Sequence, residues 1–330
     1  MERIRTAVIG VGHLGKYHAR ICAQSDAIEL VGVVDIDADS VHAVAAEHDT
    51  RPFTDFRDVL PHVDAVHVVV PTDMHAPVAT ACLEAGKHVL LEKPMTSTVA
   101  EADALLELAR RHDRILQVGH VERFNPAVIG IKQVLTMPIF IEVHRLAPFN
   151  PRGTEVGVVL DLMIHDLDII LHLVQSEVER IDAVGVPVLT AREDIANARI
   201  AFANGCVANV TASRVSAERM RKIRFFQSDA YISLDYVAQN AKIYRRDGWQ
   251  IFDEVINFAG EQPLQREIQS FVDCITQGTR PDVSGEDGRR ALDVATRVTQ
   301  AAQEHLARLK ALYPDEYRRK VEQMTPPAPE

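Results

Sequence analysis

The chain has 330 residues, of which 47% are hydrophobic and 25% are charged, and its formal net charge is −11. This ordinary globular composition suggests about two domains, and the spread of acidic charge disfavours nucleic-acid and anionic-membrane partners, which need a concentrated basic face. Because there is no signal-peptide pattern, no apolar run of transmembrane length and no CxxC spacing among the four cysteines, the sequence predicts a cytoplasmic protein with reduced thiols.

The first 120 residues alternate short apolar runs with amphipathic stretches. The short runs predict strands at Arg5–Gly10, Ile28–Asp35, Asp64–Val70, His88–Leu91 and Ile115–Gly119. A helix is expected directly after the first strand, and another at Thr98–Asp113. Ser97 or Thr98 with Glu101 resembles a capping box at the start of that second helix. Short β-branched runs between helical patterns indicate βαβ units and a parallel sheet.

After residue 120 the pattern changes, which predicts a second domain over residues 121–330, with residues 324–330 as a disordered tail. Helices are expected at Val159–Val174, Leu264–Gln277 and Glu286–Leu309. Consecutive strands are expected at Arg180–Leu189, Ala196–Ala203, Cys206–Arg214, Lys222–Gln227, Tyr231–Tyr236 and Ala241–Arg245. Asn204-Gly205 between two of these runs is a strong hairpin signal. Strands joined by short turns indicate an antiparallel sheet packed on helices on one face.

A glycine-rich turn, GVGHLG at Gly10–Gly15, follows the first expected strand and opens the first expected helix. Gly10 permits a tight turn, Gly12 lets the backbone approach a pyrophosphate, and Gly15 lets the helix pack on the strand. Asp35 ends the second strand, where a carboxylate accepts hydrogen bonds from ribose hydroxyls and repels the 2′-phosphate of NADP. The turn and the acid therefore predict NAD binding. The alternative is a glycine turn beside a solvated acid.

Glu92-Lys93-Pro94 ends the strand His88–Leu91. Ligands bind at the carboxyl ends of strands in a doubly wound sheet, and a lysine there can stabilise a developing alkoxide. The alternative is a surface ion pair before a helix cap.

Asp161, His165 and Asp168 share one face of an otherwise apolar helix. Such a stripe is costly unless its polar groups are paired or used. We expect Asp161 to orient the imidazole of His165, which would take the proton from an alcohol. One alternative is a hydrogen-bonded structural histidine. Another is a metal site from His165, Asp166 and Asp168, but Asp166 points off this face, so we expect no metal.

Two loops after predicted strands carry further candidates. In His120–Pro126, Arg123 is a candidate for anion or hydroxyl recognition and Asn125 for hydrogen bonding to a hydroxyl. The alternative for that segment is packing at a domain junction. Pro71–His75 would suit a loop passing over the nicotinamide ribose, or it is only the entry of a helix.

Together these motifs resemble the glucose-fructose oxidoreductase / inositol dehydrogenase / rhizopine catabolism (Gfo/Idh/MocA) family, over essentially the whole chain. The glycine turn, Pro-Thr-x-x-His, Glu-Lys-Pro and Asp-x-x-x-His occur in the family's order. The resemblance implies an α/β Rossmann domain, followed by an α+β domain with a large, mostly antiparallel sheet. It also implies a homodimer or homotetramer assembled through that sheet.

By this resemblance, the catalytic set is Lys93, Asp161 and His165. The implied contacts of an NAD cofactor are Gly10, Gly12, His13, Leu14, Gly15, Asp35, Ile36, Pro71, Thr72, His75, Glu92 and Lys93. The expected substrate contacts are Lys93, His120, Arg123, Asn125, Asp161 and His165.

The stretch Gly119–Pro126 is similar to family members that oxidise the 3-hydroxyl of UDP-N-acetylglucosamine or its uronate, toward the 3-amino sugars of lipid A or polysaccharide. We therefore expect an NAD-dependent dehydrogenase of a nucleotide sugar. One alternative is an inositol, polyol or free-sugar dehydrogenase. The other is a non-catalytic dinucleotide-binding regulator, although such members tend to lose the lysine or the histidine, and this chain has both.

Overall fold

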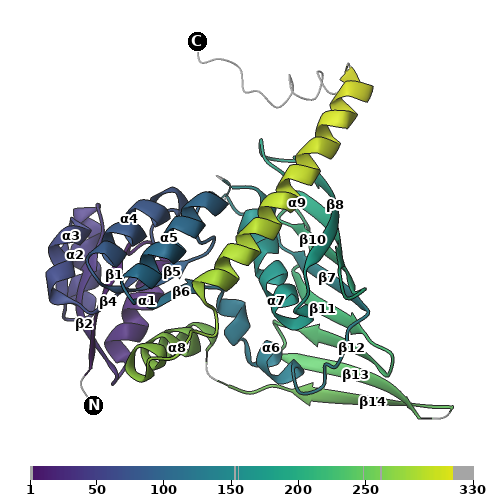
Figure 1. Ribbon diagram of the computed structural model, residues 1–330, viewed down its shortest axis with the longest axis horizontal. Coiled ribbons are helices and arrows are strands. Elements are labelled where there is room, and N and C mark those ends of the chain that lie inside the picture. The colour runs from purple at the N-terminus through teal and green to yellow at the C-terminus, as the bar shows by residue number, and fades with distance from the viewer. Residues whose placement is uncertain (1–2, 152–153, 155, 248, 261, 315–330) are drawn as a thin grey trace.

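The computed structural model describes residues 3–314, apart from 152, 153, 155, 248 and 261. Two sheets, each with its own helices, lie side by side, and the long helix α9 (Gly285–Leu312) runs along both parts (Figure 1). The predicted tail, residues 324–330, lies outside the described residues. Within the described ranges, no helix combines the length and the apolarity needed to cross a membrane.

The first sheet has six parallel strands in the order β3-β2-β1-β4-β5-β6, the order of a doubly wound dinucleotide-binding fold. The strands are β1 (Ile4–Ile9), β2 (Ile28–Val34), β3 (Arg51–Phe53), β4 (Ala65–Val68), β5 (His88–Glu92) and β6 (Leu116–Gly119). The helices around them are α1 (His13–Gln24), α2 (Ala38–Glu47), α3 (Phe56–Val59), α4 (Thr72–Glu84) and α5 (Val99–Arg111). The predicted parallel sheet is thus confirmed.

The capping box at the start of α5 is confirmed, and Thr98 is its N-cap. The Glu101 backbone N–H donates to the Thr98 hydroxyl at 3.2 Å, and the Thr98 backbone N–H donates to the Glu101 carboxylate at 2.9 Å. The edge strand β3 was not predicted, because three residues are too short to show an alternating pattern.

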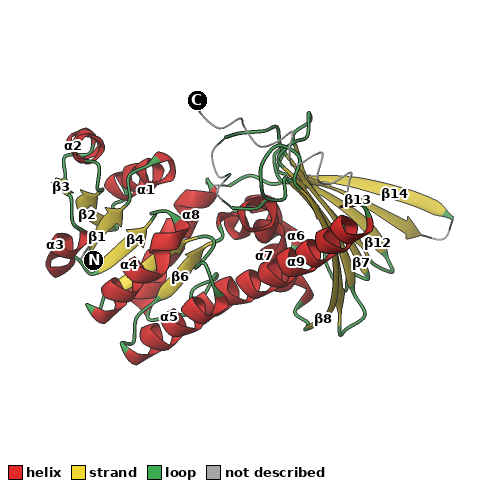
Figure 2. Ribbon diagram, turned by 90° about the horizontal axis from the view of Figure 1, so that it is seen from above, coloured by secondary structure: helices red, strands yellow, loops and turns green. Residues whose placement is uncertain are grey.

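The second sheet has eight strands in the order β14-β13-β12-β11-β7-β10-β9-β8, and only the pair β7 and β10 is parallel. The strands are β7 (Phe140–Leu146), β8 (Val178–Val186), β9 (Ile195–Phe202), β10 (Val207–Ser213), β11 (Met220–Phe226), β12 (Ala230–Asp235), β13 (Asn240–Asp247) and β14 (Gln250–Asn257). Helices α6 (Pro126–Ile131), α7 (Ile164–Val174) and α9 lie on one face of the sheet, as Figure 2 shows. The large, mostly antiparallel sheet is confirmed.

The predicted hairpin at Asn204-Gly205 is confirmed. It joins β9 to β10, with Gly205 at a φ of +86° and the Phe202 N–H donating to the Cys206 carbonyl at 2.9 Å. By contrast, β7 and β14 were not predicted. In β7 the charged Arg145 takes a buried, inward-facing position that an apolar pattern would not reveal.

The end of the chain returns to the first sheet. Helix α8 (Pro263–Gln277) buries Ile268, Phe271 and Val272 in the same apolar cluster as residues of β1 and α1. Helix α9 contacts α5 and β6 as well as α7 and β8. The domain boundary at residue 120 stays a prediction. The packing of α8 and α9 shows that residues far beyond this boundary help to complete the core of the first sheet.

Candidate active site

The glycine turn between β1 and α1 has three different local requirements. Gly10 has a φ of +91°, and a Cβ there would collide with the Val69 carbonyl oxygen. A Cβ at Gly15 would collide with the Gly10 carbonyl oxygen, so only glycine lets α1 lie this close to the turn. At Gly12, in contrast, a Cβ would meet nothing within 4 Å. The space over Gly12 is therefore open to an incoming group.

Asp35 lies directly after β2 and faces the glycine turn. Its carboxylate accepts hydrogen bonds from the backbone N–H groups of Val11, at 2.8 Å, and Asp37, at 3.1 Å. The next residue, Ile36, is 94% exposed. Open space at Gly12, the N-terminus of α1 beginning at His13, and a carboxylate with an apolar neighbour at the end of β2 all fit a dinucleotide.

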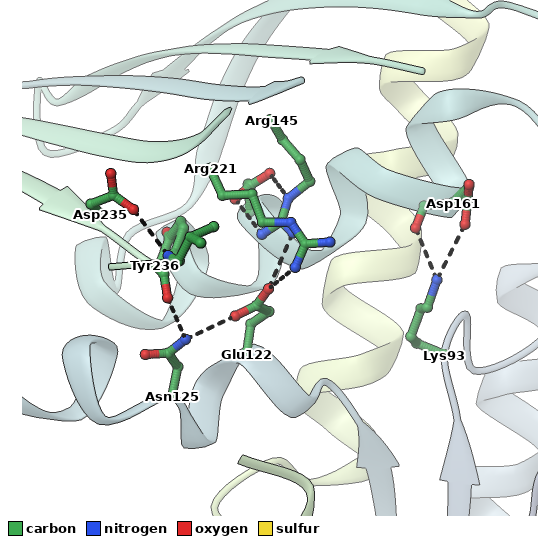
Figure 3. Close-up of polar contacts among 10 residues, drawn as sticks. Lys93, Glu122, Asn125, Arg145, Asp161, Arg221, Asp235 and Tyr236 are labelled. Carbon is green, nitrogen blue, oxygen red and sulfur yellow. Dashed lines mark hydrogen bonds and ion pairs between the residues drawn. The ribbon is translucent and has the colours of Figure 1, made fainter. Parts of the chain in front are cut away.

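Lys93 follows β5 and reaches into the second domain (Figure 3). Its Nζ donates to the backbone carbonyl of Asp161 at 2.9 Å and lies 3.6 Å from the Asp161 carboxylate. The two side chains remain 19% and 26% exposed, so a ligand can reach them. Since an ammonium group has three donors, this pairing leaves donor capacity for a substrate oxygen.

Asp161 differs from its expected role of orienting His165. It lies in a π-turn, Val159–Met163, that precedes α7, and the wider π geometry breaks the α-helical spacing assumed from the sequence. Its carboxylate faces Lys93, and among the described residues no hydrogen bond joins it to His165. Asp161 is therefore placed to hold Lys93 and not to orient His165.

His165 sits in the first turn of α7, with its ring edge-on to that of His120. The ring centroids are 6.2 Å apart and the planes are at 89°. The Nδ1 of His165 and both ring nitrogens of His120 are buried and have no hydrogen-bond partner in the described part of the chain. Burial, followed by the positive charges of Lys93 and Arg145, holds the pKa of His165 well below its ordinary 6.5. The imidazole is therefore neutral at pH 7 and able to accept a proton.

The acids next to His165 on α7 are both bound to buried arginines. Arg145 binds Asp166 through two hydrogen bonds of 2.6 and 3.0 Å. Arg123 binds Asp168 in the same way, at 2.8 and 3.0 Å. Because both carboxylates are occupied, the arrangement disfavours the alternative of a metal site built from His165 and these two acids.

Arg123 and Asn125 also differ from their expected roles. Arg123 is buried, and it lies 3.6 Å from Asp287 in addition to its pair with Asp168, so its charge is already balanced. The Asn125 side chain caps α6 by accepting the Ala127 N–H at 3.0 Å. These contacts favour the alternative of packing at the domain junction.

His75 links the loop after β4 to the segment that carries Lys93. Its Nδ1 is 2.8 Å from the Pro94 carbonyl oxygen, and its Nε2 is 3.0 Å from that of Val70. The neighbouring Pro71 and Thr72 lie at the start of α4. Because both ring nitrogens face carbonyl groups of the protein, His75 positions this edge of the site, and its contact with a cofactor stays a prediction.

Glu92 belongs to a buried cluster that sequence reasoning missed. Its carboxylate accepts the Lys93 backbone N–H at 3.1 Å and lies 3.1 Å from His18 Nε2. Burial alone would raise the pKa of Glu92, but His18 and Lys93 outweigh it and lower that pKa. Glu267 from α8 is fully buried beside them, with no hydrogen-bond partner among the described residues for either carboxylate oxygen. His18 is one of the four buried residues of α1, and nothing near it in the sequence indicates which acids it meets.

Comparisons with known proteins agree with this arrangement. A family model described as "Oxidoreductase family, NAD-binding Rossmann fold" matches residues 4–120, and one described as "GFO/IDH/MocA C-terminal domain" matches residues 139–233. The chain is 39% identical to UDP-N-acetylglucosamine 3-dehydrogenase from Acidithiobacillus ferrooxidans, over 93% of this chain and 100% of the relative. It is 27% identical to a myo-inositol 2-dehydrogenase from Thermotoga maritima, over 88% and 93% of the two chains.

Solved structures show the same likeness. The structure of UDP-N-acetylglucosamine 3-dehydrogenase GnnA from Acidithiobacillus ferrooxidans superimposes with a TM-score of 0.88 at 40% identity, over 92% of this chain and 99% of that one. The scyllo-inositol dehydrogenase from Lactobacillus casei, with bound NAD(H) and scyllo-inositol, shares the fold with a TM-score of 0.79 at 21% identity, over 92% and 98% of the two chains. With both family models matched, this chain belongs to the Gfo/Idh/MocA family, as an oxidoreductase with an NAD-type dinucleotide cofactor that acts on CH–OH groups.

Proposed function

We propose that this protein is an NAD-dependent dehydrogenase that oxidises a secondary hydroxyl of a sugar, namely the 3-hydroxyl of a UDP-N-acetylglucosamine-type nucleotide sugar. The observation that carries the proposal is the arrangement of Lys93 and His165 at the junction of the two domains. Asp161 holds Lys93, and the charge of Lys93 acts on the neutral imidazole of His165. The similarity to a UDP-N-acetylglucosamine 3-dehydrogenase over the whole length supports this substrate class.

The reaction divides between these side chains. The substrate hydroxyl lies between Lys93 and His165, and the neutral imidazole accepts the hydroxyl proton as general base. Lys93 donates a hydrogen bond to the oxygen as its negative charge develops. Asp161 holds the ammonium group in place through its backbone carbonyl and its carboxylate. When bound, NAD supplies the acceptor for the hydride that leaves the same carbon.

The proposed preference for NAD over NADP rests on Asp35. The Asp35 carboxylate accepts hydrogen bonds from the Val11 and Asp37 N–H groups. These bonds hold the carboxylate at the end of β2, where an adenosine ribose would lie. A fixed negative charge there repels a 2′-phosphate. Binding titrations should therefore give a much smaller dissociation constant for NAD than for NADP. Equal binding of NADP would contradict this role of Asp35.

Substitution of the two catalytic candidates tests the mechanism. Lys93→Met and His165→Ala should each lower kcat by roughly 10²–10⁴-fold, the usual contribution of a positioned acid or base. Lys87→Met is the matched control, since Lys87 lies just before the other end of β5 and its Nζ donates to the Val63 carbonyl. Near-native turnover by the Lys93→Met, His165→Ala double variant would refute the assignment.

A substrate panel separates the rival functions. Reduction of NAD is followed with UDP-N-acetylglucosamine, its uronate and inositols as substrates. The ketone product is trapped, because oxidation of an alcohol by NAD is often unfavourable at neutral pH. The proposal requires activity with a UDP-sugar. Activity with inositols alone indicates a polyol dehydrogenase, and no turnover of any substrate, even in the ketone-reducing direction, indicates a regulator.

A further inference from the structure

A pocket of about 380 Å³ lies beside the candidate active site, and three of its lining residues come from the segment His120–Pro126. Its wall combines the segment after β6, the start of β11 and the end of β12. Its lining residues are Val121, Glu122, Asn125, Arg219, Arg221, Tyr236, Val237 and Pro263. Figure 3 shows several of these side chains in one polar network next to the Lys93–Asp161 pair.

Arg221 is poorly compensated in this network. The register of β7 and β11 sets Arg221 opposite Arg145, and like charges directly opposite on a sheet repel. Arg145 is satisfied by Asp166 and by Glu122, whose oxygen lies 3.2 Å from the Arg145 guanidinium. Among the described residues, Arg221 reaches only that same Glu122 oxygen, at 3.5 Å. Arg145 and Arg221 therefore share the charges of Asp166 and Glu122, and Arg221 has the longer and weaker of the contacts.

Arg219 adds another positive charge at the same place. It is exposed, and within the described residues it has no hydrogen bond or ion pair, while its charge acts on Arg221. In this group the cations are Arg145, Arg219 and Arg221, and the acids are Asp166 and Glu122, which leaves a surplus of one positive charge on the pocket side. Closely spaced guanidinium groups with spare donors are a typical phosphate-binding arrangement.

Tyr236 supplies an independent sign of a missing ligand. Its side chain is only 4% exposed and lines the pocket, yet its hydroxyl has no hydrogen-bond partner in the described structure. Burial of a hydroxyl without a partner is unfavourable, and a ligand acceptor oxygen within reach of it would remove that cost. Burial, followed by the Asp166 carboxylate, raises the pKa of Tyr236, so the hydroxyl remains a neutral donor.

We propose that Arg219 and Arg221, with the Tyr236 hydroxyl as a further donor, form the subsite for the diphosphate of the nucleotide-sugar substrate. The inference rests on the proposed function and extends it to the part of the substrate that an inositol lacks. The placement suits the chemistry, because the diphosphate is attached at C1 of the same pyranose ring whose C3 hydroxyl is oxidised. Arg221 is close enough to His165 for its charge to act on the imidazole.

Calorimetric titration of the NAD-saturated enzyme with UDP and with uridine tests the subsite without turnover. We expect Arg219→Gln and Arg221→Gln each to weaken UDP binding by about 10- to 100-fold, the effect of one charge-assisted hydrogen bond, and to leave uridine binding unchanged. KM for the UDP-sugar should rise by the same factor, with a much smaller change in kcat. Arg110→Gln is the control, since Arg110 is an exposed arginine of α5 paired with Glu286.

Arg219→Gln keeps the test decisive if Arg221→Gln disturbs folding, because the exposed Arg219 has no described partner to lose. The subsite is refuted if UDP binds the wild type no more tightly than uridine does, or if Arg219→Gln binds UDP as the wild type does. Arginine-dependent UDP binding without turnover of any UDP-sugar would leave the subsite standing and refute the proposed function. Turnover of a UDP-sugar by the arginine variants with unchanged KM would refute the subsite and leave the proposed function standing.

Discussion

Lys93 and His165 would present a charged donor and a neutral acceptor to the same substrate oxygen. The Lys93 ammonium group is paired with the carboxylate and the backbone carbonyl of Asp161. The His165 imidazole has no acid of its own, because the carboxylates of Asp166 and Asp168 are bound to arginines. A fixed donor and a neutral acceptor at one oxygen are what removal of a hydroxyl proton requires.

The low pKa of His165 predicts the pH dependence of the reaction. Because the folded pKa is depressed well below 6.5, the imidazole stays neutral as the pH falls through 6.5 and is protonated only at lower pH. The pH profile of kcat/KM should therefore show no loss of activity near pH 6.5. A descending limb with an apparent pKa at or above 6.5, absent in a stability control at the same pH, would contradict this expectation.

The raised pKa of Glu267 predicts that the wild-type protein loses stability as the pH rises, and that Glu267→Gln does not. Burial and the neighbouring Glu92 raise its pKa well above 4.5, so the folded state keeps a proton that the unfolded chain releases above that pH. Its contribution is fully present below pH 4.5 and is lost at about 1.4 kcal/mol per pH unit above it, until the folded pKa is reached. Glu267→Gln avoids this loss.

The melting temperature of Glu267→Gln relative to wild type should therefore rise as the pH increases from 5 toward neutrality. The readout is this slope, because a constant offset would come from packing of the new amide. The exposed Glu107→Gln, whose lost carboxylate is paired with Arg111 on the surface of α5, serves as the control for the substitution itself. A flat difference for Glu267→Gln would show that Glu267 is ionised in the folded protein.

At the level of elements, the turn from β1 into α1 separates packing from ligand binding. Gly15 lets the helix approach the turn, while a Cβ at Gly12 would meet no atom of the described structure within 4 Å beyond its chain neighbours. The π-turn before α7 has a comparable local effect, since it directs Asp161 toward Lys93. In both places a small backbone feature decides which groups a helix presents to the site.

Two alanine substitutions in the glycine turn should therefore have different effects, one on NAD binding and the other on the stability of the fold. Gly12→Ala should keep a near-native melting temperature but weaken NAD binding by about tenfold or more, because the methyl group enters the space of the pyrophosphate. Gly15→Ala should destabilise the fold by about 1–3 kcal/mol, because its methyl group meets the Gly10 carbonyl. Melting curves and NAD titrations measure both effects, and native NAD affinity in Gly12→Ala would contradict the assignment.

At the level of the whole molecule, the second sheet has one face covered by helices and one face open in the described structure (Figure 2). The open face carries a row of aromatic rings with centroids 4.9–5.6 Å apart, formed by Phe140, Phe226, Tyr231 and Tyr244. A contiguous apolar surface of this kind marks an interaction site. It supports the proposal that the protein is a homodimer or homotetramer joined through this sheet.

Light scattering coupled to size exclusion tests this assembly. We expect the wild type to have the mass of two or four chains, and Tyr231→Glu to lower that mass because it places a charge in the middle of the aromatic row. The same substitution at the exposed Tyr313, beyond the end of α9, should not change it. A monomeric wild type would exclude the interface.

The parallel sheet, the glycine turn, the hairpin at Asn204-Gly205 and the capping box were all predictable from the sequence, because each depends on residues close together in the chain. Lys93 and His165 were also identified, because they belong to short motifs. The roles of their neighbours were not, since those depend on which charges meet in space.

The tertiary structure alone decided these pairings. Lys93 meets Asp161 across 68 positions of the chain, Arg123 meets Asp168 across 45, and Arg145 meets Asp166 across 21. A buried charge must find a partner wherever the packing allows one, and periodicity along one helix cannot show which partner another element supplies. The sequence by itself therefore determined the dinucleotide fold and singled out Lys93 and His165 as the proposed catalytic pair. The three-dimensional packing determined how these two side chains are held and where the surplus positive charge proposed to bind a substrate lies.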